Sequence, residues 1–189
     1  MKKYLFALIA FSLFGMALKA QQTPKTATEI IDNAVAQAGR QHKKALIMFH
    51  ASWCTWCKKM DASINDSTCK NYFDSNFVID KITLFEQGKN VVLNNPGGED
   101  LYLKYGGDNG IPFWLIFDEN GNLLANANYR PANDTTGKPQ NIGCPASEEE
   151  VNYFVSLLKK YTPISDAQAK AVHDRFRKNE VVVNNMSIK

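Results

Sequence analysis

The stretch that decides the fold is residues 49–61, which read Phe-His-Ala-Ser-Trp-Cys-Thr-Trp-Cys-Lys-Lys-Met-Asp. The apolar run at residues 45–49 leads into it and is typical of a buried strand. The chain then breaks at residues 50–52 and places Cys54 and Cys57 in the first turn of a predicted helix. Two thiols at this spacing can close a small disulfide ring, and the positive end of the helix dipole favours the thiolate. The stretch therefore predicts thiol–disulfide exchange.

The first twenty residues predict a cleaved secretory signal. Lys2 and Lys3 precede an uncharged stretch, residues 4–18, that is too short to span a bilayer comfortably, and the cut is expected after Ala20. A retained anchor is the alternative. Without residues 1–20 the formal net charge falls from +3 to zero, so charge gives no case for binding nucleic acid or an anionic membrane surface. We expect a periplasmic or secreted protein.

The rest of the chain, residues 21–189, has the size of one domain with its own hydrophobic core. That core is expected at about residues 26–161, with a C-terminal helical extension at about residues 162–189. A core of this size needs no disulfide to stay folded, so the Cys-x-x-Cys pair is predicted to be functional. For the two further cysteines, Cys69 and Cys144, three alternatives stay open: a structural disulfide, a third thiol beside the active site, or two buried free thiols.

Hydrophobic periodicity and capping signals predict the order of helices and strands. Helices are expected at residues 27–39, 53–64, 67–75, 96–105, 148–161 and 166–178. Strands are expected at residues 44–49, 77–83, 113–117 and 122–128, the last two as a hairpin. The first two strands enclose a helix, which predicts a parallel pair with a right-handed crossover. Residues 84–95 and 130–145 show no regular pattern.

Two motifs, together with this order of elements, resemble the thioredoxin family. The motifs are Trp-Cys-Thr-Trp-Cys-Lys at residues 53–58 and Gly-Ile-Pro-Phe-Trp-Leu-Ile-Phe at residues 110–117. In thioredoxins a Trp-Cys-x-x-Cys-Lys segment is followed by Gly-Ile-Pro and an apolar strand, and the proline is cis. The resemblance covers about residues 26–161. It implies an α/β, thioredoxin-like fold with a central mixed sheet and flanking helices, to which this chain adds an N-terminal segment and a C-terminal helix.

The resemblance implies a role for each residue at the centre of the two motifs. Cys54, nearer the helix start, is expected to be the exposed nucleophile that attacks a partner's disulfide, and Cys57 is expected to resolve the mixed disulfide. Pro112 is expected to be cis and to pack against the cysteine pair. The backbone of Ile111 would then pair with an extended substrate segment, as an added strand does.

Trp53 and Trp56 flank the thiols and are expected to contact the substrate. One position departs from the family pattern, because thioredoxins carry a buried Asp six residues before the first cysteine and this chain has Met48 there. Asp61, on the same helix face as the cysteines, is the nearest substitute for proton transfer, and the alternative is a solvated helix acid. His50 is the other candidate, against a hydrogen-bonded loop histidine.

The function predicted from these features is that of an exported thiol–disulfide oxidoreductase, with reduction of protein disulfides placed ahead of oxidation or isomerisation. The expected partners are disulfide-containing proteins and, from the resemblance, a membrane thiol donor. No cofactor beyond the Cys54–Cys57 disulfide is expected. One cysteine pair and three scattered histidines do not make a four-ligand zinc site.

A Cu(I) metallochaperone and a binding module with an idle redox pair remain alternatives. The fold also places residues 84–95 and 130–145 at the active-site end, because ligands bind beyond the carboxyl ends of parallel strands. These two segments are expected either to rim Cys54 and restrict its partners or to be solvent-facing elaborations.

Overall fold

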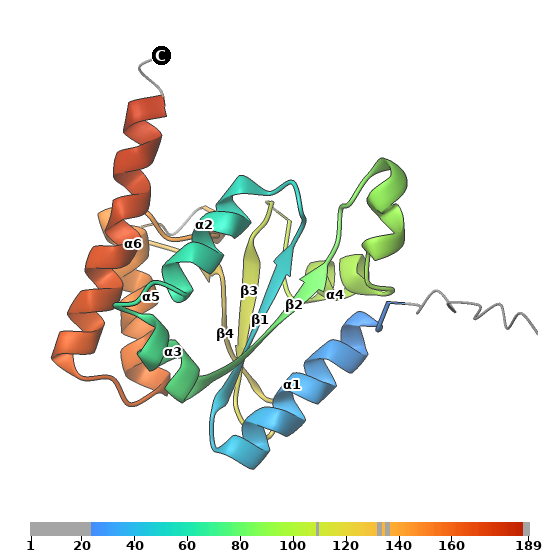
Figure 1. Cartoon of the computed structure of the whole chain (residues 1–189), viewed down its shortest axis with the longest axis horizontal. Coiled ribbons are helices and arrows are strands. Elements are labelled where there is room, and N and C mark those ends of the chain that lie inside the picture. Colours follow the sequence, from blue (N-terminus) through green and yellow to red (C-terminus); the bar gives the residue numbers. More distant parts are fainter. Residues whose placement is uncertain (1–23, 109, 132–133, 135–136, 187–189) are drawn as a thin grey trace, which may run out of the picture.

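In the computed structural model, a four-stranded mixed sheet forms the centre of the protein (Figure 1). Its strands are β1 (Lys44–His50), β2 (Phe77–Thr83), β3 (Phe113–Phe117) and β4 (Leu123–Asn126), in the order β2-β1-β3-β4. β1 and β2 are parallel, whereas β3 runs antiparallel to both β1 and β4. The α/β class, the mixed sheet and the parallel pair predicted from the sequence are therefore confirmed.

The structure describes residues 24–108, 110–131, 134 and 137–186. The signal peptide predicted for residues 1–20 lies outside the described residues. Across the described ranges, no helix combines the length and the apolar character needed to cross a membrane.

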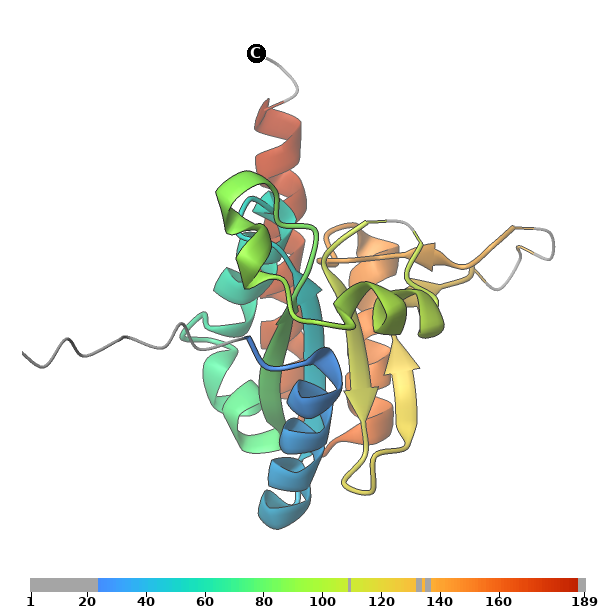
Figure 2. The ribbon, with the colours of Figure 1, turned by 90° about the vertical axis from the view of Figure 1, so that its right-hand side faces the viewer.

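Helices cover both faces of the sheet. α1 (Ala27–Gln41) and α4 (Gly98–Lys104) lie on one face, and α2 (Thr55–Ile64), α5 (Glu148–Tyr161) and α6 (Asp166–Met186) lie on the other (Figures 1 and 2). α3 (Lys70–Asn76) leads into β2. Because both faces are covered, the two central strands are apolar almost throughout, and all five residues of β3 are buried.

Two predicted helices differ from the structure in their bounds. α2 begins at Thr55 rather than at residue 53, because Cys54 has an extended backbone and is the N-cap. α6 continues to Met186 rather than ending near residue 178. The sequence after residue 178 is rich in valine and asparagine, which favour helix weakly, but the Asn179 side chain is buried and hydrogen-bonded to Ser63 and Cys144. Tertiary packing thus carries the helix further than local propensity indicates.

The two segments without a regular pattern contain short elements. Residues 84–95 include the 3₁₀ helix η1 (Gly88–Leu93), which buries none of its residues. β4 stops at Asn126, and a separate two-stranded sheet pairs β5 (Asn128–Tyr129) with β6 (Gln140–Asn141). The predicted hairpin is confirmed, since β3 and β4 pair antiparallel, but its second strand is shorter than the predicted residues 122–128, and part of the irregular segment 130–145 is strand.

Candidate active site

Cys54 and Cys57 form a disulfide at the N-terminus of α2, with Cα atoms 5.3 Å apart. β1 ends at His50 and delivers the chain to this point, where the Cys54 backbone N–H donates to the carbonyl of Ala51 (3.1 Å). The Cys54 sulfur takes the place of a capping oxygen, because it accepts the backbone N–H of Cys57 at 3.0 Å. After reduction, this N–H and the helix dipole would both stabilise negative charge on Cys54.

The expectation that Cys54 is the exposed thiol is wrong for the disulfide form. Cys54 is 3% exposed and Cys57 is 2% exposed, so exposure does not distinguish them. The physical reason is that Ile111 packs against Cys54, Cys57 and Ala51. The two residues differ in their position on α2, since Cys54 is the N-cap and Cys57 lies inside the first turn.

The loop before β3 lies against the cysteine pair. The Ile111–Pro112 peptide bond is cis, as the resemblance implies, and the carbonyl oxygen of Ile111 lies 3.5 Å from the Cys54 sulfur. Antiparallel pairing of β1 with β3 places Phe113 opposite Phe49, which brings Pro112 to the same end of the sheet as the cysteines. The structure thus brings together four residues from the two sequence motifs: Cys54, Cys57, Ile111 and Pro112.

A hollow of about 220 Å³ adjoins the pair on the α5 side. The segment before α5 forms its far wall, and this wall is built directly on the proline loop. The Asn141 amide donates to the carbonyl oxygen of Pro112 at 3.1 Å, and the Trp114 indole donates to the carbonyl of Gly143 at 2.9 Å. The lining residues are Trp56, Ile111, Pro112, Asn141, Ile142, Gly143, Cys144, Ala146 and Glu150.

The two tryptophans beside the cysteines are on the surface. Trp53 is 54% exposed, and its indole N–H donates to the backbone carbonyl of Phe85 at 2.9 Å. Trp56 is partly exposed, and the ammonium of Lys59 lies 4.1 Å from its ring centroid. Their contact with a substrate stays a prediction.

Glu86, which the sequence did not single out, is part of this site. Its carboxylate accepts the hydroxyl of Ser52 at 2.9 Å and also the Ser52 backbone N–H. The residue is 5% exposed, and the hydrogen bonds from Ser52, the backbone one foremost, lower the pKa of the Glu86 carboxyl. The one available signal was weak, namely a lone acid in the stretch of residues 84–95.

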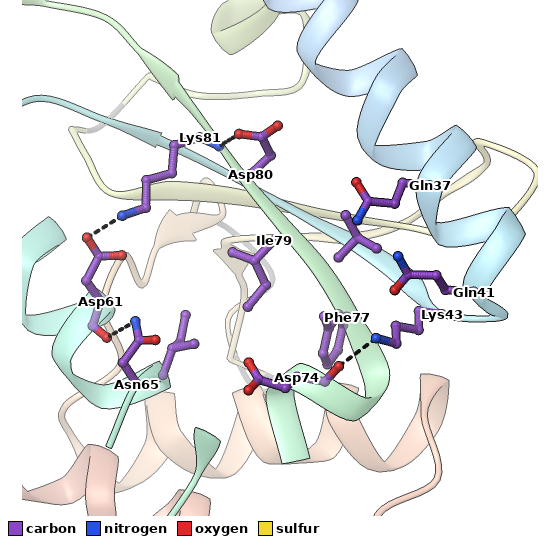
Figure 3. A pocket seen from close by; sticks show the side chains of 12 residues that line it. Gln37, Gln41, Lys43, Asp61, Asn65, Asp74, Phe77, Ile79, Asp80 and Lys81 are labelled. Atoms are coloured by element: carbon purple, nitrogen blue, oxygen red, sulfur yellow. Dashed lines mark hydrogen bonds and ion pairs between the residues drawn. The ribbon is translucent and has the colours of Figure 1, made fainter. Parts of the chain in front are cut away.

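The two candidates for proton transfer both have partners other than the cysteines. In Figure 3, Asp61 points from α2 toward Lys81 on β2, and a carboxylate oxygen lies 2.5 Å from the lysine nitrogen. Asp61 and Lys81 line a polar hollow of about 460 Å³ between α1, α2 and β2. His50 Nε2 lies 3.1 Å from the Thr83 hydroxyl, and burial lowers the pKa of His50. His50 is therefore a hydrogen-bonded, neutral histidine at neutral pH.

Cys69 and Cys144 are free and buried. The alternative of a disulfide between them is wrong, because Cys69 lies at the start of α3 while Cys144 lines the hollow beside Pro112. Burial raises the pKa of both thiols, that of Cys144 to about 12. The structure thus combines the other two alternatives, since both are buried free thiols and one of them adjoins the active site.

Metal-binding groups are sparse in the part of the chain that the structure describes. Within it, no three His, Cys, Asp or Glu side chains are grouped so that they could hold a metal ion. A Cu(I) site made by two cysteines needs fewer ligands and stays a prediction.

Comparison with known proteins places this site in a family. A model of the thioredoxin-like domain matches residues 31–136, while no curated protein matches the chain. Solved structures similar to it include a disulphide isomerase from Xylella fastidiosa Temecula1 (21% identity, 87% of this chain and 98% of that one, TM-score 0.47). Another is the oxidised C-terminal domain of DsbD from Neisseria meningitidis (19% identity, 73% and 98%, TM-score 0.43). The family match covers more than half of the chain and includes the Cys54–Cys57 disulfide, so this protein belongs to the thioredoxin-like domain family and carries the Cys-x-x-Cys site of a thiol–disulfide oxidoreductase.

Proposed function

We propose that this protein is an exported oxidoreductase that reduces disulfides in other proteins. The observation that carries the exchange chemistry of this proposal, whichever its direction, is the placement of the Cys54–Cys57 disulfide as the cap of α2, where the Cys57 N–H lies 3.0 Å from the Cys54 sulfur. A thiolate at Cys54 would be stabilised there, and a thiolate is the nucleophile in disulfide exchange.

The proposed reaction has two exchange steps. The Cys54 thiolate attacks one sulfur of the partner's disulfide, forms a mixed disulfide and releases the other partner sulfur as a thiolate, which takes up a proton. Cys57 then loses its proton and attacks the Cys54 sulfur, which releases the second partner thiol and leaves the Cys54–Cys57 disulfide. Two electrons pass to the partner, and a thiol donor outside the chain must return them. No cofactor other than the disulfide takes part.

Exposed apolar side chains around the disulfide support a protein as the partner. Val91, Val92 and Leu93 on η1 are 50–56% exposed, and they follow directly on the loop that binds Trp53 through Phe85. A cluster of exposed apolar groups next to a reactive centre is typical of a protein-binding surface. We propose that η1 and the segment before α5 are the two rims of the substrate site. The partner's chain would lie between them and pair with the backbone of Ile111 beside Pro112.

Asp61 stays a candidate for moving the Cys57 proton, now as part of an ion pair. Asp61 and Cys57 are one helical turn apart on α2, and Lys81 holds the carboxylate from the neighbouring strand.

Export and the periplasmic or secreted location are proposed from residues 1–20 alone. The membrane thiol donor is proposed from the resemblance to thioredoxins. Both proposals concern what surrounds the domain and leave the exchange chemistry unchanged.

The test is to measure both the potential and the turnover of the mature protein. Equilibration with glutathione buffers, followed by the fluorescence of Trp53 and Trp56, is expected to give a potential near −270 mV, that is, roughly that of thioredoxin. The reduced protein is also expected to reduce the disulfides of insulin. A potential near about −120 mV would overturn the reductase proposal in favour of an oxidase.

Two matched variants separate the roles of the cysteines. Cys57→Ser is expected to stop at a mixed disulfide with insulin, and Cys54→Ser to form none. If both variants form mixed disulfides equally, the assignment of attacking and resolving thiols is wrong. If the wild-type pair forms no disulfide, the redox function itself fails and Cu(I) titration of the reduced protein becomes the next measurement.

A further inference from the structure

We infer that Glu86 tunes the active site: its carboxylate positions the loop before Cys54 and makes the Cys54–Cys57 couple more reducing. The inference deepens the proposed function, on which it rests only in that the pair exchanges electrons with thiols. It assigns Glu86 as a positioning residue, because its contacts are to Ser52 rather than to the reacting sulfurs.

The segment after β2 is hydrogen-bonded to the loop before Cys54 through two pairs of residues. Glu86 accepts both the backbone N–H and the hydroxyl of Ser52, and Phe85 accepts the indole N–H of Trp53 through its carbonyl oxygen. Cys54 follows immediately. The loop that presents the nucleophile is therefore fastened along its length to the segment after β2.

The backbone of that segment is shaped for this contact. Phe85 has a left-handed conformation with φ at +61°, which bulky residues rarely adopt. The Asn94 side chain bonds the backbone on both sides of Glu86, accepting its N–H at 2.9 Å and donating to its carbonyl at 3.3 Å. The structure around Glu86 thus maintains an unfavourable turn that directs the carboxylate at Ser52.

The Glu86 carboxylate also places a negative charge at a buried position. Among the described residues the buried polar side chains are Ser63, Glu86 and Asn179, of which Glu86 alone is ionisable. The hydrogen bonds from Ser52 lower the pKa of Glu86, so the carboxylate is charged at neutral pH. His50 is the ionisable group whose charge acts on Glu86, and it does not cancel the charge of the carboxylate, because burial lowers the pKa of His50 and keeps it neutral.

The sign of the effect follows from the charge on the reduced form. Reduction by glutathione converts the Cys54–Cys57 disulfide and two glutathione thiols into two protein thiols and one glutathione disulfide. Cys54 then carries thiolate charge, which the Cys57 N–H and the helix dipole favour. A buried carboxylate on the neighbouring loop opposes the same charge. Glu86 therefore destabilises the reduced form and lowers the reduction potential.

The test is the Glu86→Gln variant of the mature protein. Glutamine keeps an oxygen for the Ser52 N–H, and the Ser52 hydroxyl can accept from the new amide, so the fastening is retained while the charge is lost. The equilibrium constant for reduction by glutathione is expected to rise about tenfold, which corresponds to a potential about 30 mV less negative. The pKa of Cys54, followed by thiolate absorbance, is expected to fall by about one unit.

Two further variants make the result decisive. Glu119→Gln removes the same charge at the β3–β4 turn, at the opposite end of the sheet, and is expected to shift the constant less than about twofold. Asn90→Lys, at a partly exposed position whose side chain bonds Glu86, adds a cation and is expected to shift the constant in the direction of Glu86→Gln.

If Glu86→Gln and Glu119→Gln give the same constant, the inference is wrong. Should Glu86→Gln not fold, Asn90→Lys decides alone, and an unchanged constant in it overturns the inference. A wild-type protein that never equilibrates with glutathione would instead contradict the proposed function. Those two failures are therefore distinguishable.

Discussion

Two kinds of cysteine occur in this protein, and their surroundings set their chemistry. Cys54 accepts a backbone N–H at a helix N-terminus, a position that favours the thiolate. Cys144 is buried in the wall of the hollow beside Pro112 and accepts only the amide of Asn179 among its described hydrogen bonds. Burial raises the pKa of Cys144 to about 12 and also raises that of Cys69. One pair is arranged to react and the other two thiols are arranged to stay protonated.

We therefore expect the rate of alkylation to distinguish Cys54 from the buried thiols Cys69 and Cys144. The oxidised native protein should take up almost no N-ethylmaleimide, whereas the unfolded oxidised protein should take up two labels, at Cys69 and Cys144. In the reduced native protein Cys54 should react at least about 100-fold faster than either, because the thiolate fraction controls the rate. Mass spectrometry of tryptic peptides gives the rates. Equal labelling of Cys144 in native and unfolded protein would contradict the burial described here.

Among the residues of the site, the sequence predicted those contacts that depend on local spacing along the chain. The Cys54–Cys57 pair could be found because both thiols belong to one helical turn. The Glu86–Ser52 contact could not be found, since the two residues are 34 apart and no pattern joins them. The sequence placed Asp61 on the same helix face as the cysteines. It could not predict the partner Lys81, which lies on a strand whose register only the fold determines.

The helix ends of the scaffold are fixed by two capping boxes. Thr26 and Glu29 cap α1, and Ser147 and Glu150 cap α5. In α5 the Glu150 carboxylate accepts the backbone N–H groups of both Ala146 and Ser147 at 3.0 Å. This cap therefore also fixes the end of the segment that forms the wall of the active-site hollow.

We expect Ser147→Ala to lower the free energy of unfolding by about 1 kcal/mol, because the side chain that accepts the Glu150 N–H is lost. Denaturant titration followed by circular dichroism measures this. Ser156→Ala is the matched control, since it makes the same change at an exposed position inside α5 and is expected to alter the free energy by less than about 0.5 kcal/mol. Equal effects of the two variants would show that the cap contributes nothing.

These caps are why the elements were largely predictable. A Ser or Thr followed three residues later by Glu marks a helix start in the sequence itself. β5 and β6 were missed because each has two residues, too few to show an alternating pattern. The left-handed conformation of Phe85 was not predicted either, because neither this residue nor its neighbours in the chain are glycine or asparagine, the residues that usually indicate such a turn.

α6 ties together parts of the molecule that are far apart in sequence. Its Phe176 ring packs against Phe154 of α5 (5.2 Å between centroids) and Phe73 of α3 (6.4 Å). Next to it, Arg175 pairs with Asp66 at 2.9 Å, and one turn further on Asn179 bonds Cys144. The helix lies beyond residues 31–136, the part matched by the family model, yet its buried side chains belong to the main core. The sequence predicted a helix at residues 166–178 but not this packing, because the aromatic partners of Phe176 come from two other helices.

We expect Phe176→Ala to lower the free energy of unfolding by about 3–5 kcal/mol, because it removes a fully buried ring and leaves a cavity between α3, α5 and α6. Loosening of α6 should also release Asn179 from Cys144, so Cys144 should become accessible to alkylation in the native state. Lys178→Ala, an exposed change on the same helix, should alter stability by less than about 0.5 kcal/mol and leave Cys144 protected. Denaturant titration and N-ethylmaleimide labelling measure the two effects together. A loss below about 1 kcal/mol with Cys144 still protected would mean that α6 is an appendage rather than part of the core that supports the active-site wall.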